Sequence, residues 1–371
     1  MNEVPQLAHG RRTVTAVIPP EMDSSENAGF AVFGRSGDFD ILFWTCAYMM
    51  SDTPHSSWIV PDARIHGTIF MAIPRSDTPQ LGDNAFVRTG LHLPQYLKQC
   101  RFDIVEEADT ITWFVDERQY VWDPPNWRLK GEHAGVDVDL VAIAAGPATW
   151  AAGPFEDIMK NQGGGYDVPI EVTGTITAGG ITYPLEDAHG SHERVGMGQG
   201  RDIISECFGA EVVVSDLFVD DVHILFGQHT GREMSFGKID IGDQSIPVMP
   251  LMGQGTMSLT TLEKWHDPRS GLLLPSHWSL EMTAEDGTAC ELDVRAEGRA
   301  YWHYTTKSGV MVMVWQLSRA NGTLTLADGT KREIVDALVA GRWGRSLLVA
   351  DETIEGPKFA VLEELAAMAQ K

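Results

Sequence analysis

Short apolar segments, separated by turn residues, run through nearly the whole chain and constrain its fold more than any other feature. Most of them are about five to eight residues long, with Gly, Pro, Asn or Asp between them, as in proteins built from β-strands. Residues 136–143 alternate polar and apolar side chains with the period of a strand that has one buried face. Turns at 178–180 and 220–221 predict two β-hairpins. The chain is therefore predicted to be all-β, built from sandwiches or barrels.

The length indicates two domains, because 371 residues at roughly 100–200 residues per domain exceed one. A stretch rich in glycine and proline over 146–165 is interpreted as a loop that covers one end of a barrel. We predict an N-terminal arm over 1–28, an N-terminal β domain over 29–165 and a C-terminal β domain over 166–371. Apolar residues at helical spacing after Gly356-Pro357 predict a helix at the end of the second domain.

The chain carries a large negative charge, with 28 Lys and Arg against 52 Asp and Glu and a net charge of −24. Such a surface repels nucleic acid and anionic membranes, so we expect neither as a partner. No apolar run reaches the roughly 18 residues of a membrane-spanning helix, and the N-terminal residues lack a signal-peptide pattern. We expect a cytoplasmic protein without a membrane span. The sequence leaves open whether the protein forms a homodimer.

A glycine-flanked strand pair leads into a histidine-rich motif near the middle of the chain. Gly174, Gly179-Gly180 and Tyr183 mark the strand pair, and the motif reads Asp187-Ala188-His189-Gly190-Ser191-His192-Glu193-Arg194-Val195-Gly196. This arrangement resembles the double-lipocalin family that includes the AttH-like proteins, carotenoid 1,2-hydratase, kievitone hydratase and several fungal Diels–Alderases.

The resemblance implies two lipocalin-like antiparallel β-barrels or sandwiches packed together, with a ligand cavity at or between them. It also implies hydration, dehydration, isomerisation or cyclisation of an apolar small molecule, without a redox cofactor. The motif here reads His-Glu-Arg-Val-Gly and departs from the His-x-Trp-Gly form of the carotenoid enzymes, so a carotenoid substrate is not implied.

The central motif is also the richest source of titratable side chains. Adding or removing water, or moving a double bond, needs a proton donor and an acceptor in a dry pocket. His189 or His192 can transfer a proton near neutral pH if it faces the cavity, and Asp187 or Glu193 can orient it or act as the base. The alternative is a solvated loop at the end of a hairpin.

A second candidate pair is Asp221 and His223, which stand two apart on a predicted strand and so share one face with Leu225. The alternative is an acidic hairpin tip with an outward histidine. Candidate substrate-binding residues are aromatic or polar side chains on predicted strands, for which packing in a barrel wall is the alternative. They are Tyr183, Gln228, His277, Trp278, Tyr301 and His303.

Motifs for other chemistries are missing from the sequence. It has no HExxH motif and no cupin-type His-x-His pair, so we expect no metal. The glycines at 196, 198 and 200 do not begin a strand–turn–helix unit, so we expect no dinucleotide cofactor.

Our leading hypothesis is a cofactor-independent lyase or isomerase that acts by acid–base catalysis on an apolar terpenoid, steroid or polyketide-like substrate. Two alternatives remain: a non-catalytic carrier of a hydrophobic ligand, and a metal-dependent β-barrel oxygenase.

Overall fold

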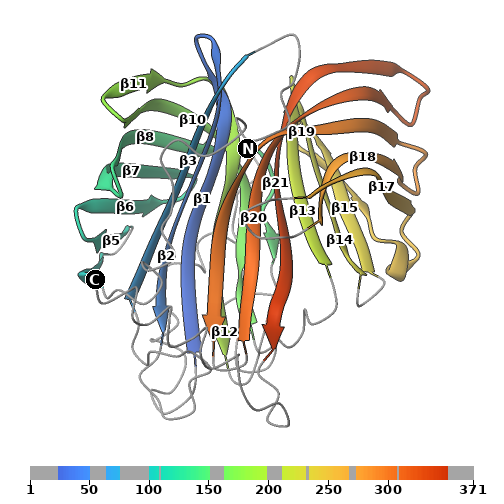
Figure 1. Cartoon of the computed structure of the whole chain (residues 1–371). Coiled ribbons are helices and arrows are strands. Elements are labelled where there is room, and N and C mark those ends of the chain that lie inside the picture. The colour runs from blue at the N-terminus through green and yellow to red at the C-terminus, as the bar shows by residue number, and fades with distance from the viewer. Residues whose placement is uncertain are drawn as a thin grey trace.

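The described residues form two antiparallel sheets that curl into two lobes lying side by side (Figure 1). The computed structural model describes residues 24–50, 64–75, 100–107, 110–150, 163–198, 211–230, 234–266, 273–306 and 309–349. The predicted all-β class with two curled sheets is confirmed. The helix predicted after Gly356-Pro357 lies outside the described residues.

The first lobe is a 12-stranded sheet with the order β3-β2-β1-β12-β10-β8-β7-β6-β5-β4, in which β9 and β11 also pair with β10. Its strands are β1 (Ser24–Ser36), β2 (Phe39–Met50), β3 (Arg64–Pro74), β4 (Phe102–Glu106), β5 (Ile111–Val115), β6 (Arg118–Asp123), β7 (Asn126–His133), β8 (Val136–Ala144), β9 (Thr149–Trp150), β10 (Gly163–Ala178), β11 (Ile181–Pro184) and β12 (Glu186–Gly198).

The second lobe is a nine-stranded sheet with the order β16-β15-β14-β13-β21-β20-β19-β18-β17. Its strands are β13 (Glu211–Val219), β14 (Val222–His229), β15 (Met234–Ile241), β16 (Gln244–Val248), β17 (Thr256–His266), β18 (Leu273–Thr283), β19 (Ala289–Thr306), β20 (Gly309–Thr325) and β21 (Lys331–Val349), and a 3₁₀ turn, η6 (Pro250–Met252), lies between β16 and β17. Both hairpins predicted from turn residues are present, as β10–β11 and β13–β14.

The chain passes from one sheet to the other between Gly198 and Glu211. The predicted boundary at 165/166 lies instead inside β10, because residues 163–165 are the start of a strand rather than the end of a loop. The three glycines pair with β12, and a Cβ at Gly165 would lie 2.1 Å from the carbonyl oxygen of Arg194. Glycine is needed there for close approach of two strands. β1 begins at Ser24, within the arm predicted over 1–28.

β1 and β2 are buried on both faces, which explains why the sequence of β2 is apolar except at Asp40 and Thr45. One face, with Phe30 and Phe43, belongs to the interior of the first lobe. The other face, with Phe33 and Trp44, packs against β20 and β21 of the second lobe, where Trp315 contributes. The two lobes are therefore joined through an apolar core of their own.

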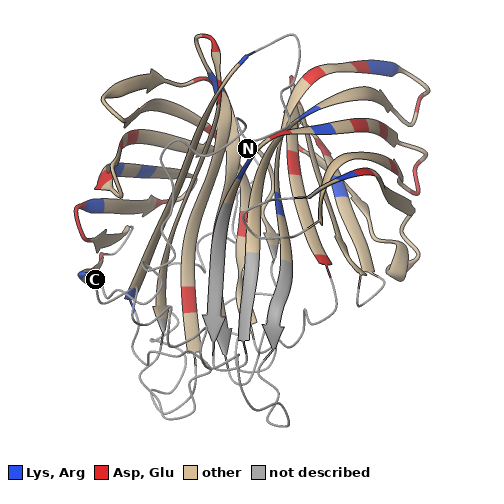
Figure 2. Cartoon of the chain, viewed as in Figure 1, with Lys and Arg blue, Asp and Glu red and all other residues tan. Residues whose placement is uncertain are grey.

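The described interior of the first lobe is filled with aromatic side chains. Trp113, Tyr120, Trp122 and Trp127 are all at most 2% exposed and belong to one core. Acidic residues are distributed over both lobes rather than gathered in one place (Figure 2). No described helix has the length and apolar character needed to cross a membrane.

Candidate functional site

The histidine-rich motif forms β12, a strand in the middle of the first sheet, and not a loop at the end of a hairpin. β12 pairs with β1 on one side and β10 on the other. Because side chains alternate along a strand, His189 and His192, three residues apart, point to opposite faces. His192 points into the first lobe, whereas His189 packs against Phe218 of the second lobe. The predicted single cluster is therefore split between two environments.

His192 lies in a fully buried aromatic cage. Trp122 Nε1 donates a hydrogen bond to His192 Nε2 over 2.9 Å, and His192 Nδ1 donates to the carbonyl oxygen of Gly29 over 2.9 Å. The ring also stacks on Phe30, with centroids 4.3 Å apart. Burial lowers the pKa of His192 to about 3. Its ring is thus neutral and both nitrogens are occupied, which is the geometry of a structural histidine.

A cleft of about 400 Å³ opens between the lobes beside His189. We call it the inter-lobe cleft. Four strands contribute its lining, which consists of Phe33, Gly34 and Arg35 from β1, Asp187 and His189 from β12, Phe218 and Val219 from β13 with Asp220 after it, and Val335, Asp336, Ala337 and Leu338 from β21. Its volume is in the range of small-molecule sites.

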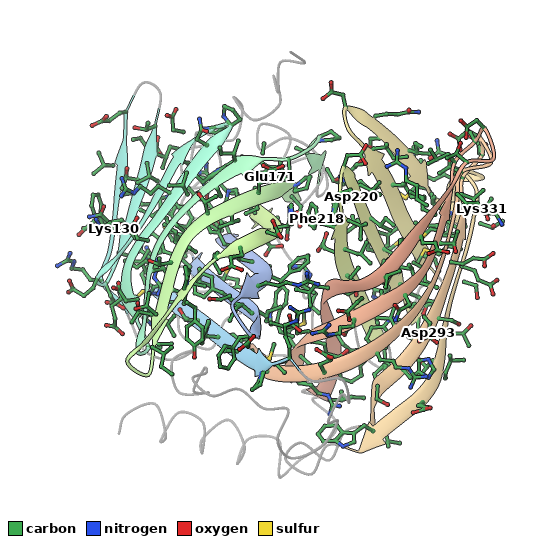
Figure 3. All side chains as sticks on the ribbon, turned by 90° about the horizontal axis from the view of Figure 1, so that it is seen from above. Lys130, Glu171, Phe218, Asp220, Asp293 and Lys331 are labelled. Atoms are coloured by element: carbon green, nitrogen blue, oxygen red, sulfur yellow. The ribbon has the colours of Figure 1, made fainter. Side chains whose placement is uncertain are left out.

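His189 is held in the wall of this cleft by its neighbours. Its ring stacks on Phe218, with centroids 4.8 Å apart and planes 11° apart. Glu171 of β10 and Phe33 of β1 are its direct cross-strand neighbours, and Figure 3 shows Glu171 and Phe218 at the junction of the lobes. Nδ1 of His189 is buried and has no hydrogen-bond partner within the described part of the chain.

The environment of His189 keeps its imidazole neutral at neutral pH. Burial lowers the pKa of His189, and the nearby carboxylates of Glu171 and Asp187 oppose this only in part. A neutral imidazole in the wall of the cleft can accept a proton from a molecule bound there.

His223 continues the stack on the other side of Phe218, with ring centroids 4.3 Å apart. Its Nε2 lies 3.0 Å from Asp216 Oδ1 and its Nδ1 lies 2.9 Å from Asp240 Oδ2. Two carboxylates on both nitrogens require both to carry a proton. Burial alone would lower the pKa of His223, but the hydrogen bonds to Asp216 and Asp240 raise it overall. The two carboxylates therefore favour the protonated form of His223.

Asp221 is not the partner of His223. It stands in the exposed β13–β14 turn, where the strand alternation ends, and it pairs with Arg332 at 2.5 Å. Asp187 does share a face with His189, as their spacing predicts, and lines the same cleft.

Glu193 lies in an ion pair between the lobes. Arg342 Nη1 donates to Glu193 Oε2 over 2.9 Å, and Asn27 Nδ2 donates to Glu193 Oε1 over 2.8 Å. Arg342 also lies 3.9 Å from Asp167. Burial, aided by the carboxylate of Asp216, raises the pKa of Asp167 to about 7 against the opposing charge of Arg342. This group of charges links β12 of the first lobe to β21 of the second.

The predicted substrate-binding residues are dispersed over the fold. Gln228 and Trp278 line a small cavity of about 40 Å³ in the second lobe. Tyr183 is packed in the first-lobe core against Phe70, and His277 bonds Asp293 at 2.6 Å. Tyr301 and His303 belong to the backbone of β19, and their side chains lie outside the described part of the structure.

Arg35, Glu171 and Phe218 were not predicted as site residues. Each reaches the site only through strand pairing or through the contact between lobes, which join residues far apart in sequence. One signal existed in the sequence: a strand assignment for 186–198 would have placed His189 and His192 on opposite faces.

No protein-family model and no curated protein sequence matches the chain. Solved structures do. A protein of Nitrosomonas europaea with the provisional name AttH is 13% identical, with a TM-score of 0.51 over 88% of this chain and 93% of that one. CghA is 10% identical, with a TM-score of 0.53 over 89% of this chain and 90% of that one.

Kievitone hydratase from Nectria haematococca is 10% identical, with a TM-score of 0.45 over 93% of this chain and 94% of that one. At such low identities the similarity shows only the fold. The fold comparison rests on the Nitrosomonas protein and CghA. The resemblance to AttH-like proteins that the strand pair and the histidine motif indicated is confirmed at the level of the fold: the chain shares with AttH and CghA an architecture of two curled antiparallel sheets.

Proposed function

We propose that the protein is a cofactor-independent lyase or isomerase that acts by acid–base catalysis on an apolar small molecule bound in the inter-lobe cleft. The observation that carries this proposal is His189, whose neutral imidazole stands in the wall of a cleft of about 400 Å³. In this proposal His189 is the general base, and the catalytic role moves away from His192.

The reaction is a proton transfer that one histidine can complete. His189 removes a proton from a substrate carbon, and the electron pair of that C–H bond forms a new double bond. In a dehydration the electrons of the adjacent C–O bond leave with the hydroxyl group, which takes the proton back from His189 and departs as water. In an isomerisation the electrons of the original double bond move to its far carbon, which takes the proton back from the imidazolium.

Arg35 is the group suited to stabilise negative charge that develops on a substrate oxygen. It lines the cleft, where its Nη2 donates to the backbone carbonyl oxygen of Asp336 over 3.5 Å and lies 3.9 Å from Asp336 Oδ2. A preorganised guanidinium beside developing charge is a common source of transition-state stabilisation.

The substrate is an apolar molecule with at least one oxygen function. Phe33, Phe218 and Leu338 supply apolar walls, while Arg35, His189 and the carboxylates of Asp187, Asp220 and Asp336 supply polar contacts. A terpenoid, steroid or polyketide-like molecule has this character.

The proposal is tested by incubating the protein in D₂O with a panel of terpenoid and polyketide alcohols and enones. Mass spectrometry then follows loss or gain of water and uptake of deuterium at carbon. We expect wild type and Glu281→Gln, an exposed change on β18, to turn over the same compound, and His189→Gln to lose about 10²–10⁴-fold in rate.

Full activity of His189→Gln would reject the assignment of the base. A compound that binds unchanged, with an affinity indifferent to His189→Gln, would favour the hydrophobic-ligand carrier instead.

A further inference from the structure

Three side chains of metal-binding type converge at the rim of the first lobe, in a group that shares no residue with the inter-lobe cleft. They are His66 on β3, Asp116 in the β5–β6 turn and His133 at the end of β7. One donor atom of each lies within 4.8 Å of the other two. The sequence separates these residues widely, and only the curl of the sheet brings them together.

Each of the three side chains is oriented by a second partner. Tyr120 Oη lies 2.6 Å from His66 Nε2, and Thr68 Oγ1 lies 2.9 Å from His133 Nδ1. The backbone N–H of Arg101 donates to Asp116 Oδ1 over 2.9 Å. This is the arrangement of metal sites, in which the atom that does not bind the ion is held by a hydroxyl, carbonyl or amide group.

His66 leaves one polar atom unsatisfied. Its side chain is only 2% exposed, and its Nδ1 has no hydrogen-bond partner in the described ranges. A buried nitrogen without a partner destabilises the folded protein, so such atoms call for something else that engages them. With Nε2 directed at Tyr120, Nδ1 is the atom that a metal would take.

The turn that carries Asp116 is built to hold the carboxylate in place. Asp116 has a φ of 51°, which the short side chain of aspartate tolerates. Its backbone N–H donates to the carbonyl oxygen of Arg101 over 2.9 Å, reciprocal to the bond from Arg101 N. Behind the turn, a Cβ at Gly131 would lie 2.1 Å from the carbonyl oxygen of Glu117, so glycine permits β7 to approach the turn.

The local charge allows a cation beside the buried guanidinium of Arg118. Asp116 supplies a negative charge within the group itself. Glu132 and Asp137 act on Arg118 electrostatically from β7 and β8 and offset its charge further.

We propose that His66, Asp116 and His133 bind a divalent transition-metal ion of the Zn²⁺ type. Two imidazoles and one carboxylate are a ligand set for Zn²⁺ and its neighbours, whereas Mg²⁺ and Ca²⁺ prefer oxygen ligands. The two rings stack with centroids 3.7 Å apart and planes 26° apart, so one ring turns when the ion binds. His133 is only half-buried and is the ring that turns. The ion would tie β3 to the rims of two hairpins.

The experiment uses Co²⁺ as a spectroscopic probe for the full-length protein after dialysis against a chelator. We expect one equivalent of Co²⁺ to bind, with visible d–d absorption, and Zn²⁺ to displace it and raise the melting temperature. Asp116→Asn and His133→Gln are expected to lower the affinity by at least about 100-fold, because loss of even an outer partner of a metal ligand lowers it about 10–100-fold.

Asp103→Asn, an exposed carboxylate on the neighbouring strand β4, is the matched control and should bind Co²⁺ like wild type. Binding of less than one equivalent by folded wild type would overturn the proposal, and so would equal affinity in Asp116→Asn and His133→Gln. None of these readouts requires turnover, so they are independent of the function proposed for the cleft.

Discussion

At the scale of single residues, two histidines of one strand lie in different environments. His192 has both nitrogens in hydrogen bonds inside the first lobe, and His189 stands in the wall of the inter-lobe cleft. The two side chains point to opposite faces because the residues are three apart on a strand. Chemistry and stability can therefore be tested separately in one motif.

The pH dependence of catalysis should report the protonation of His189. Its pKa lies below the ordinary histidine value because the ring is largely buried, so kcat/KM should fall only at a pH below about 6.5 and be flat above it. Glu171 raises this pKa through its charge, so Glu171→Gln should shift the acid limb to lower pH. The measurement is a pH–rate profile for both proteins. An identical limb in Glu171→Gln would show that His189 is not the titrating group.

Replacing His192 should damage stability more than chemistry. His192→Ala removes a buried ring and leaves Trp122 Nε1 without its acceptor, which we expect to lower the free energy of unfolding by about 3–5 kcal/mol. Urea unfolding measures the loss. Turnover abolished with unchanged stability would instead return the catalytic role to His192.

The same ring should make the protein sensitive to acid. His192 stays neutral in the folded protein to about pH 3, whereas the unfolded chain binds a proton near pH 6.5. Its contribution to stability is therefore present above pH 6.5 and is lost as the pH falls toward 3. His192→Gln does not titrate, so its urea midpoint should fall less between pH 7 and pH 4 than that of wild type, after both are normalised to pH 7.

The sequence motif named the residue types of the site but not their arrangement. Polarity suggested a loop over 186–198, yet the polar side chains of β12 are satisfied by partners from strands remote in sequence, such as Trp122 and Arg342. Tertiary contacts of this kind decide whether a polar segment is solvated or buried, and no local pattern reports them.

At the scale of elements, β12 holds the first sheet together between β1 and β10. Two close approaches to its neighbours depend on glycine: Gly190 beside β1 and Gly165 of β10 beside β12. Gly165, which lies in the segment interpreted as a loop, and Gly190 both allow close packing of neighbouring strands.

Gly190→Ala should weaken the pairing of β12 with β1. The added Cβ would lie 1.8 Å from the carbonyl oxygen of Ala31, so the strands must separate, at a cost of about 1–3 kcal/mol or more. Hydrogen exchange should show faster exchange for amides of β1 and β12 and little change in β18. Uniform protection like that of wild type would contradict this account.

Local pairings were predictable and distant ones were not. The hairpins β10–β11 and β13–β14 follow from alternation and turn residues. The pairings of β1 with β12 and of β13 with β21 join the ends of each sheet's sequence, and nothing local specifies them. For this reason the fold class was predictable, whereas the strand that runs through the predicted boundary at 165/166 was not.

At the scale of the whole molecule, the cleft exists because two sheets are held at a fixed separation. An apolar core between β1–β3 and β19–β21 holds the two sheets together. The ion pair between Arg342 and Glu193 fixes how β21 lies against β12. Both sides of the proposed active site thus depend on one interface.

A double-mutant cycle should measure the pairing of the lobes. Arg342→Gln leaves Glu193 without its cation, and we expect a loss of about 1.5–3 kcal/mol in the free energy of unfolding. Glu193→Gln in the same chain should recover part of that loss, because the carboxylate is then neutral as well. Strict additivity of the two single changes would show that the ion pair contributes nothing to stability.

Because β1 and β2 are buried on both faces, the first half of the chain cannot be separated from the second without exposing apolar side chains. Leu42, Trp44 and Ile69 are dry only while the second sheet covers them. A fragment ending at Gly198 would expose these side chains to water as an apolar patch, and such a patch favours self-association. The first half of the chain therefore needs the second to keep this face buried, although each has an interior of its own.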